Sequence, residues 1–290
     1  MVLPMKTVFI TGASTGIGHA SAIHLSRNGY LVFAGVRKTS DADRLNQEGG
    51  DNVVPVPIDV TDGESIAAAV DLVRPRLAAR GLDGLVNNAG IGLSAPVEYV
   101  TEEDLRRVFE VNVFGQIAVT QALLPLIRQA RGRIVNMGSV GSHISIPFFG
   151  AICATKSAFR SLNDALRLEL HPFGIHVAMI EPASIHTPAT DKTLGDAEGV
   201  IAALPPEGKQ RYGVMLREFI RRAYEREEAG SPPEVVAAAV HHALTDEHPR
   251  ARYPVGKYST VLVNLPRFLP EGLLDRIRYR LFGMPATTEG

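Results

Sequence analysis

Short apolar runs alternate along the chain with longer segments whose apolar residues recur every three or four positions. Most of these runs are apolar at successive positions and do not alternate with polar residues, which is typical of strands covered by helices on both faces. The predicted strands are Thr7–Ile10, Leu31–Val36, Val53–Ile58, Gly84–Val86, Arg133–Met137 and Ile175–Ile180, and the predicted helices are Gly16–Asn28, Asp41–Gln47, Ser65–Ala79, Glu102–Ile127 and Ala154–Leu170. This alternation predicts an α/β fold with a doubly wound parallel sheet.

The pattern changes after residue 187. Residues 188–230 carry no strand signal, but they contain a helical stripe of apolar residues, namely Tyr212, Met215, Phe219, Ile220 and Ala223. The run Ser231-Pro232-Pro233-Glu234 predicts a helix start with Ser231 as the N-cap.

The C-terminal part combines a strand with helical segments. Arg252–Val255 is predicted as a last strand, at a sheet edge because it contains a proline. Pro266 and Pro270 limit any amphipathic tail helix to Glu271 onward. With neither a long linker nor a repeat, residues 1–290 are predicted to form one domain, with a core over 5–187 and C-terminal helices and an edge strand over 231–290.

Composition excludes several classes of protein. The 30 Lys and Arg residues nearly balance 31 Asp and Glu, so the chain lacks the basic excess that nucleic-acid binding needs. A hydrophobic content of 45% argues against disorder. One Cys excludes a disulfide framework and fits a reducing cytosol, and no signal-peptide pattern opens the chain, so a cytoplasmic location is expected. His241 and His242 are adjacent and point to different helix faces, so no metal site is expected.

A glycine-rich turn, Thr11-Gly12-Ala13-Ser14-Thr15-Gly16-Ile17-Gly18, joins the first predicted strand to the first helix. Glycines in such a turn allow the backbone to approach a pyrophosphate closely and allow the helix to pack on the strand. The helix N-terminus then presents free N–H groups to the phosphates. The turn therefore predicts dinucleotide binding, the alternative being an ordinary glycine-rich turn.

Further motifs follow the later strands. They are Asp59-Val60, Asn87-Asn88-Ala89-Gly90, Asn112, Ser139, Lys156 and the segment from Pro182 to Thr187. In this order and spacing, and with the glycine turn, they resemble the short-chain dehydrogenase/reductase family over residues 5 to about 190. The resemblance implies a Rossmann-type fold with NAD or NADP across the carboxyl ends of the strands.

The resemblance also implies roles for single residues. Asp59 and Val60 are expected to hold the adenine, Asn88 and Ala89 the adenosine ribose, and Ile185 and Thr187 the nicotinamide amide. The full set of expected cofactor-binding residues is Gly12, Ser14, Gly16, Ile17, Gly18, Arg37, Asp59, Val60, Asn88, Ala89, Gly90, Lys156, Pro182, Ile185 and Thr187.

The end of the second strand bears on the choice of nicotinamide. NAD-binding members usually carry an acidic residue there, which bonds the ribose 2′-hydroxyl. Here Val36 takes that place and Arg37 follows. A guanidinium suits the 2′-phosphate of NADP, so NADP is expected to be preferred, with NAD as the alternative. The other interpretation of Arg37 is a solvated side chain at a strand end.

The chemistry of the family depends on a Y-x-x-x-K motif in the helix after the fifth strand. In the family the phenol protonates the carbonyl oxygen as hydride arrives, and the lysine lowers the phenol pKa and holds the nicotinamide ribose. A serine steadies the substrate oxygen and an asparagine maintains a water relay. Ser139, Lys156 and Asn112 match these catalytic positions, but Ile152 stands where the motif has tyrosine.

Three explanations of Ile152 stay open. The chain is an altered dehydrogenase, a natural member with another proton donor, or a silenced member that acts by binding nucleotide. The donors considered are Cys153, His143, His186 and a water molecule that donates through Lys156. Since general acid catalysis contributes ~10²–10⁴-fold, slow turnover is expected from this chain.

Residues 231–282 resemble, more loosely, the steroid- and retinol-dehydrogenase-like branch of the family. This implies a lipophilic secondary alcohol or ketone as substrate, under a lid formed by residues 188–230. The lid offers Leu194, Ile201, Leu204, Tyr212, Met215 and Phe219. The equal alternative is that these residues only close the core.

Two features concern partners. Leu273, Leu274, Ile277 and Leu281 are predicted to form one face of a tail helix, flanked by arginines. Such a helix packs on its own domain, on a second subunit or on a membrane surface, and membrane contact is the least expected of the three. Family members pair through helices equivalent to Glu102–Ile127 and Ala154–Leu170. The second of these carries Ala158, Phe159, Leu162 and Leu166, so a homodimer or homotetramer is expected.

Overall fold

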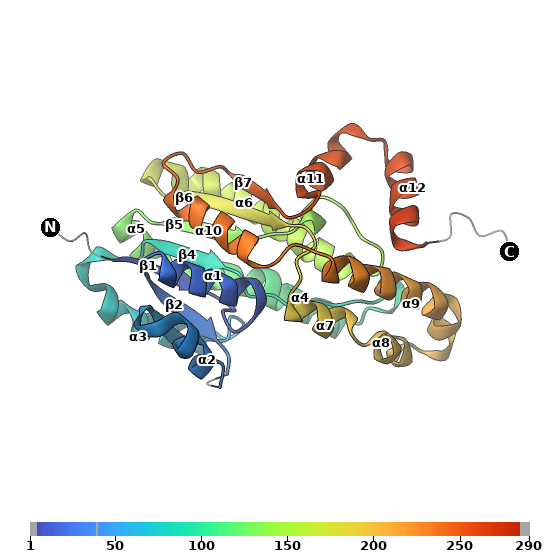
Figure 1. Ribbon diagram of the computed structural model, residues 1–290, viewed down its shortest axis with the longest axis horizontal. Helices are drawn as coiled ribbons and strands as arrows, with labels where there is room; N and C mark the ends of the chain where they lie inside the picture. The colour runs from blue at the N-terminus through green and yellow to red at the C-terminus, as the bar shows by residue number, and fades with distance from the viewer. Residues whose placement is uncertain (1–4, 39, 285–290) are drawn as a thin grey trace.

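A seven-stranded parallel sheet forms the centre of the molecule, in the order β3-β2-β1-β4-β5-β6-β7 (Figure 1). The computed structural model describes residues 5–38 and 40–284. The strands are β1 (Lys6–Ile10), β2 (Tyr30–Val36), β3 (Val53–Pro57), β4 (Gly84–Asn87), β5 (Arg133–Met137), β6 (His176–Pro182) and β7 (Arg252–Val255). The strand order reverses between β1 and β4, the point at which doubly wound sheets bind ligands. The predicted fold class and the edge position of β7 are confirmed.

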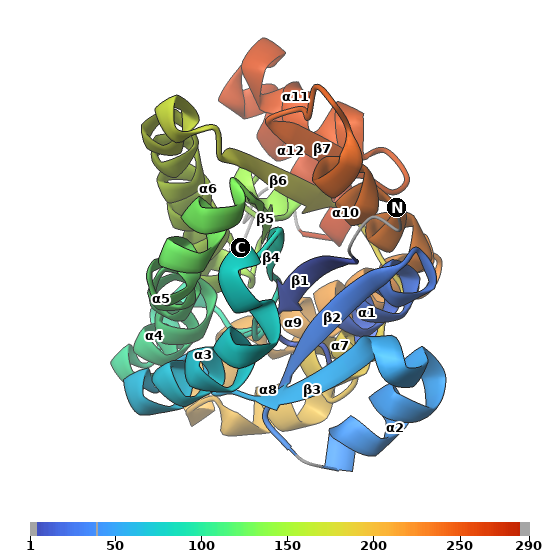
Figure 2. The ribbon, with the colours of Figure 1, turned by 90° about the vertical axis from the view of Figure 1, so that its left-hand side faces the viewer.

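Helices cover both faces of the sheet (Figure 2). One face carries α1 (Gly16–Arg27), α2 (Ser40–Gly49) and α10 (Glu234–Thr245), and the other carries α3 (Gly63–Leu77), α5 (Gly115–Ala130) and α6 (Gly150–Leu170). Neighbouring strand residues enter different cores. Val8 packs with the first group of helices and Phe9 with the second, and both are fully buried. This two-sided burial explains why the strands are continuous apolar runs.

The helix predicted over Glu102–Ile127 is interrupted. It consists of α4 (Glu102–Phe109), a π-helical turn (Glu110–Phe114) and α5. Among the described residues, the stretch Glu102–Ala130 is the one helix long and apolar enough to cross a membrane, and half of its apolar window is buried inside the molecule. Its buried side chains, such as Val119 and Leu123, pack in the core with α3 and the sheet, as expected for a core helix.

The N-cap predicted at Ser231 is wrong by two residues. Helix α10 begins at Glu234, with Pro233 as its N-cap and no capping side chain. Ser231 instead forms a β-bridge with Ile185, in which its N–H donates to Ser184 O at 3.0 Å and its carbonyl accepts from His186 N at 3.0 Å. Its backbone is therefore held in an extended pairing before the helix starts.

The remaining helices lie beyond the carboxyl ends of the strands (Figure 1). They are α7 (Pro188–Leu194), α8 (Ala197–Ala203), α9 (Pro206–Glu228), α11 (Ser259–Phe268) and α12 (Glu271–Phe282), and short 3-10 turns occur at Gly50–Asn52, Ala78–Arg80, Val97–Tyr99, Val140–Ser142 and His171–Phe173. Helix α11 was not expected, because Pro266 lies inside it. The proline falls in its last turn, where it removes one hydrogen bond two residues before the helix ends.

Candidate active site

Two cavities meet at the carboxyl edge of the sheet. The first, of about 500 Å³, lies along the glycine turn and the ends of β2, β4 and β6. The second, of about 390 Å³, is bounded by the loop after β5 and by α6, α9, α11 and α12. Ser139, Lys156, Thr187 and Glu227 line both cavities. A polar site and an apolar site therefore share one junction.

The glycine turn adopts backbone conformations that favour glycine. Gly12 has φ +66° and Gly16 has φ +59°, and a Cβ on Gly12 would lie 2.8 Å from Ala89 Cα. Asn88 braces the turn, since its Nδ2 donates to the carbonyl oxygens of Thr11 and Gly12 at 3.0 Å each. The turn is thereby tied to the end of β4.

Nearly all of the expected cofactor-binding residues line the first cavity. They are Gly12, Ser14, Gly16, Ile17, Arg37, Asp59, Val60, Asn88, Ala89, Gly90, Lys156, Pro182, Ile185 and Thr187. Gly18 does not, because it lies beneath the turn, where an added Cβ would come within 2.2 Å of Gly12 O. Gly18 serves close packing of helix α1 on the turn, the third role of glycine in such motifs.

Charged groups lie at one end of this cavity. Arg37 is exposed at the end of β2. Hydrogen bonds from Thr61 N (2.9 Å) and Thr61 Oγ1 (2.7 Å) lower the pKa of Asp59, and the positive charge of Arg37 lowers it further. Arg44 of α2 donates to Ser14 O and places a second guanidinium beside the turn. Sequence reasoning missed Arg44, because its helix reads as an ordinary polar surface.

The first cavity fits a nicotinamide dinucleotide. Its turn has no side chain at Gly12 and Gly16, where a pyrophosphate needs close backbone approach, and the α1 N-terminus follows at once. Asp59 and Arg37, expected at the adenosine, offer an acceptor and a cation, and Ile185 and Thr187, expected at the nicotinamide, line the same cavity as Lys156.

Asn112 is held by the π-helical turn. Its Oδ1 accepts from Ile91 N at 2.8 Å, and its Nδ2 donates to Ile91 O at 3.0 Å and to Thr155 Oγ1 at 3.2 Å. The inserted residue of a π-turn re-aims a side chain, and such turns are frequent at functional sites. Asn112 thus connects the segment after β4 to α6.

Ser139 and Lys156 face the junction of the two cavities. Ser139 Oγ accepts from Gly141 N at 3.0 Å, which leaves the hydroxyl proton able to donate. Lys156 Nζ donates to Met137 O at 2.8 Å, and burial lowers the pKa of Lys156 to about 8. Ile152, one helical turn before Lys156, lines the apolar cavity with both of them. The three expected catalytic side chains and Ile152 are therefore brought together.

The other proton donors considered for the missing phenol are poorly placed. His143 Nε2 lies 2.6 Å from Glu181 Oε1, both side chains are buried, and His143 does not line either cavity. His186 is exposed and lines neither cavity. Cys153 does line the apolar cavity, but burial raises the pKa of its thiol.

Glu227 is a residue of the site that the sequence did not reveal. It lies in the last turn of α9, lines both cavities, and accepts from Ile185 N at 3.2 Å through Oε2. Burial raises the pKa of Glu227, while hydrogen bonds from Ser184 and Ile185 oppose that shift. Its surroundings in sequence, rich in Arg and Glu, gave no signal that distinguishes it from a solvated helix face.

The predicted lid over 188–230 and the tail both wall the apolar cavity. Of the six lid residues named above, only Leu194 lines it, because the others pack in a core around Leu216, which was the alternative expected for them. The lid also contributes Ala189, Thr190, Thr193 and Ala223. The tail contributes Leu262, Leu265, Leu274, Ile277, Leu281 and Phe282. The tail helix therefore packs on its own domain, one of the three predicted arrangements.

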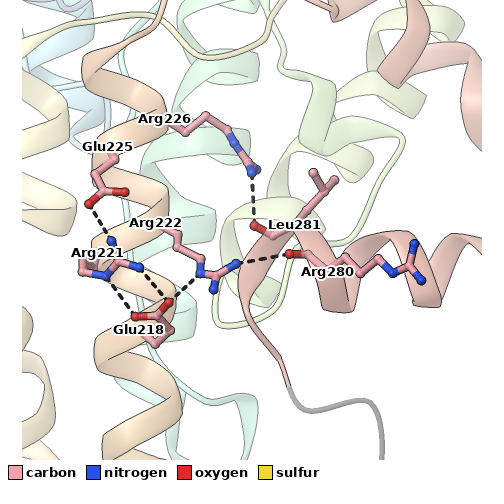
Figure 3. Close-up of polar contacts among 7 residues, drawn as sticks. All are labelled: Glu218, Arg221, Arg222, Glu225, Arg226, Arg280 and Leu281. Carbon is pink, nitrogen blue, oxygen red and sulfur yellow. Dashed lines mark hydrogen bonds and ion pairs between the residues drawn. The ribbon is translucent and has the colours of Figure 1, made fainter.

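Two arginines of α9 attach the end of α12 (Figure 3). Arg226 Nη2 donates to Leu281 O at 3.1 Å, and Arg222 Nη1 donates to Arg280 O at 3.3 Å. Arg226 also lies 5.1 Å from the centre of the Phe282 ring. We call these contacts the arginine latch. Cations at the last carbonyls of a helix complement its dipole, so the latch fixes the wall of the apolar cavity.

The histidines show no metal-binding arrangement. His241 Nδ1 lies 3.3 Å from His24 Nε2, and His242 pairs with Asp246 at 3.5 Å. Over residues 5–38 and 40–284, no group of three or more His, Cys, Asp or Glu side chains is placed to hold a metal ion.

Comparison with known sequences supports one family. The profile of the family described as short chain dehydrogenase matches residues 6–198. Human "Retinol dehydrogenase 16" is 38% identical over 287 residues, covering 97% of this chain and 90% of the relative. Mouse "17-beta-hydroxysteroid dehydrogenase type 6" is 36% identical over 286 residues, covering 97% of this chain and 90% of the relative.

Solved structures agree with this relationship. A short-chain dehydrogenase from Streptomyces avermitilis has a TM-score of 0.71 and 30% identity, and the match covers 96% of both chains. The 3-ketoacyl-(acyl-carrier-protein) reductase from Brucella melitensis, crystallised with NADH, has a TM-score of 0.70 and 25% identity over 86% of this chain and 95% of that one. With its seven-stranded parallel sheet, its glycine turn and these relatives, the chain belongs to the short-chain dehydrogenase family of oxidoreductases and is related to retinol and hydroxysteroid dehydrogenases.

Proposed function

We propose that the protein is an NADP-preferring oxidoreductase that interconverts a lipophilic secondary alcohol and its ketone. The observation that carries this proposal is the junction, at Ser139 and Lys156, of the cavity along the glycine turn with an apolar cavity. The names of two relatives, a retinol dehydrogenase and a hydroxysteroid dehydrogenase, describe enzymes of lipophilic alcohols. Leucine, isoleucine and phenylalanine side chains from α11 and α12 form the wall against which such a substrate would pack.

The residues around the junction have separate tasks. A bound nicotinamide supplies or accepts the hydride. Ser139 donates a hydrogen bond to the substrate oxygen, and the cavity wall from α11 and α12 excludes water. Asn112 holds the Ile91 segment against α6, and Lys156 places a cation beside the ribose site. Ile152 contributes no proton, so turnover is expected to lie ~10²–10⁴-fold below that of a chain with a phenol there, unless another group donates.

The preference for NADP is proposed from Arg37. Arg37 lines the cavity at the end of β2, where Val36 takes the place of the acidic residue of NAD-binding members. Arg37→Ala should weaken NADP binding about tenfold or more, the scale of a charge-assisted hydrogen bond, and leave NAD binding nearly unchanged. Titration of both nucleotides measures this, with the exposed, remote Lys209→Ala as the control for loss of one positive charge. Equal losses for both nucleotides would contradict the proposal.

Ile152 favours a second candidate function. A family member without its phenol can bind the nucleotide and act by binding, with no turnover. Assays over a panel of hydroxysteroids, retinoids and aliphatic ketones should compare the chain as it stands with Ile152→Tyr, following NADPH absorbance. Activity in the chain as it stands supports the dehydrogenase. Nucleotide binding with no turnover in either protein supports the silent member, and a gain of ~10² or more only in Ile152→Tyr indicates an altered dehydrogenase.

A cytoplasmic homodimer or homotetramer remains part of the proposal. Leu162 on α6 and Phe114 beside α5 are 42% and 56% exposed and offer apolar contacts to a second copy. Phe159, expected earlier in such a contact, is 1% exposed and belongs to the core with Val113 and Met179. Sedimentation of the chain and of a Phe114→Glu, Leu162→Glu variant tests the pairing. A monomeric chain, or an oligomer unaffected by both charges, would contradict it.

A further inference from the structure

The proposed reaction needs a proton source, and the structure narrows the candidates. A proton donor must reach the junction where hydride and substrate oxygen meet. Among the described residues that line both cavities, two have side chains that titrate, Lys156 and Glu227. Lys156 and Glu227 are therefore the two candidate proton donors in place of the phenol.

Lys156 is placed one helical turn beyond Ile152. Residues four apart on a helix lie on one face, with Cβ atoms about 5–6 Å apart. The ammonium has three N–H groups, and in the described part of the chain Met137 O is the one acceptor bonded to it. Isoleucine is shorter than tyrosine, so a carbonyl oxygen beside Ser139 can approach the lysine nitrogen more closely than a phenol would allow.

Glu227 is bound in a way that opposes proton donation. Its Oε2 accepts from Ile185 N, and Ser184 contributes a further hydrogen bond to the carboxylate. Burial raises the pKa of Glu227 in spite of these hydrogen bonds, but both bonds come from the segment after β6, so the carboxyl group is already engaged by that segment. Glu227 therefore ties α9 to the segment expected to hold the nicotinamide amide.

We propose that Lys156 itself protonates the carbonyl oxygen during reduction and, as a neutral amine, deprotonates the hydroxyl group during oxidation. The inference rests on the proposed function. In reduction, hydride from the bound cofactor forms the new C–H bond and the C=O π electrons move to oxygen. An N–H bond of Lys156 then breaks, its electron pair stays on nitrogen, and the proton forms the O–H bond. The amine takes a proton from solvent before the next turnover.

The acidity of the lysine suits this task. Burial lowers its pKa to about 8, so about nine in ten molecules carry the ammonium at pH 7. The other titratable and charged side chains that line the two cavities are Arg37, Asp59, Cys153, Lys192, Arg226, Glu227 and Arg278, and none of them contributes to this shift. An acid whose pKa lies near the working pH is an efficient proton donor.

The test is the pH dependence of kcat/KM in both directions. Reduction should fall tenfold per pH unit above about pH 8, and oxidation should fall tenfold per unit below it. Lys156→Arg keeps the positive charge but holds its proton, so reduction should drop ~10²–10⁴-fold and lose the inflection. NADPH affinity is measured in the same variant to separate proton transfer from binding. Lys209→Arg, an exposed lysine of α9 that lines neither cavity, is the matched control and should keep the profile.

A second readout needs no turnover. The ε-carbon resonance of Lys156, assigned as the signal missing from Lys156→Arg, should titrate near pH 8 in the full chain. Retention of rate and inflection in Lys156→Arg overturns the proposal, and loss of the inflection in Glu227→Gln transfers the role to Glu227. Activity that exists only in Ile152→Tyr, with NADPH binding intact, overturns the proton role but not the family reaction. Failure to bind either nucleotide overturns both.

Discussion

Removal of the Arg226 side chain tests whether the arginine latch controls the apolar cavity. Arg226→Met deletes a charge-assisted hydrogen bond to Leu281 O, worth about 1–1.5 kcal/mol in this partly exposed setting, and a cation–π contact with Phe282, worth about 0.5 kcal/mol. The sum of about 1.5–2 kcal/mol corresponds to a ~10- to 30-fold weaker docking of α12. Since Leu281 and Phe282 wall the cavity, KM for a lipophilic ketone should rise about tenfold with little change in kcat.

Hydrogen exchange gives an independent measurement of the same perturbation. Amides of α12 should exchange about tenfold faster in Arg226→Met, while those of the sheet should not change. Arg217→Met is the matched control, because Arg217 lies on the same helix and pairs with Glu198, whereas Arg221 shares the carboxylate of Glu218 with Arg222 of the latch (Figure 3). Equal KM and equal exchange in the two variants would refute the reasoning, and Arg226→Lys should restore part of the effect.

Three further outcomes are expected. Gly12→Ala should abolish nucleotide binding and lower the free energy of unfolding by at least about 1–2 kcal/mol. Alanine at φ +66° is strained, and its Cβ would meet Ala89. Unchanged binding in a titration would contradict this prediction. The chain should lose stability as pH falls below about 6.5. Burial lowers the pKa of His19, His176 and His241, so in that range the unfolded state binds more protons than the native state. Urea unfolding at pH 7.5 and 5.5 measures the loss, and equal midpoints would contradict the prediction. Asn112→Ala should lower kcat more than it changes nucleotide affinity, because it frees the Ile91 segment from Thr155; a pure loss of affinity would place Asn112 in the cofactor site instead.

The sequence predicted the sheet well because each strand is buried on two faces. Val8 and Phe9 enter opposite cores, so their strand appears as a continuous apolar run, and the glycine turn follows it directly. The residues around the cofactor cavity were found for a related reason. They follow successive strands, and the carboxyl ends of parallel strands meet at one edge.

The parts that sequence could not predict depend on contacts between distant segments. In the π-helical turn, Asn112 bonds Ile91 and Thr155, which lie about 20 and 40 residues away, and no local sequence pattern predicts these contacts. In the sequence, Glu227 resembles the other charged residues of a solvated helix, and only the fold brings Ile185 N within hydrogen-bond distance of it. The sequence left open whether the apolar stripe of α9 walls the cavity or closes the core, because only the placement of α8 decides it: most of the stripe packs in the core, and Ala223 lines the cavity.

The arginine latch has a consequence for how this protein could change its substrate. Arg222 and Arg226 bind main-chain oxygens of residues 280 and 281, so the attachment of α12 is largely independent of which side chains that helix carries. The inward positions of α12, such as Leu274 and Ile277, can therefore vary while the helix stays docked. Substitutions on the inner face of α12 could therefore reshape the apolar cavity and leave its junction at Ser139 and Lys156 unchanged.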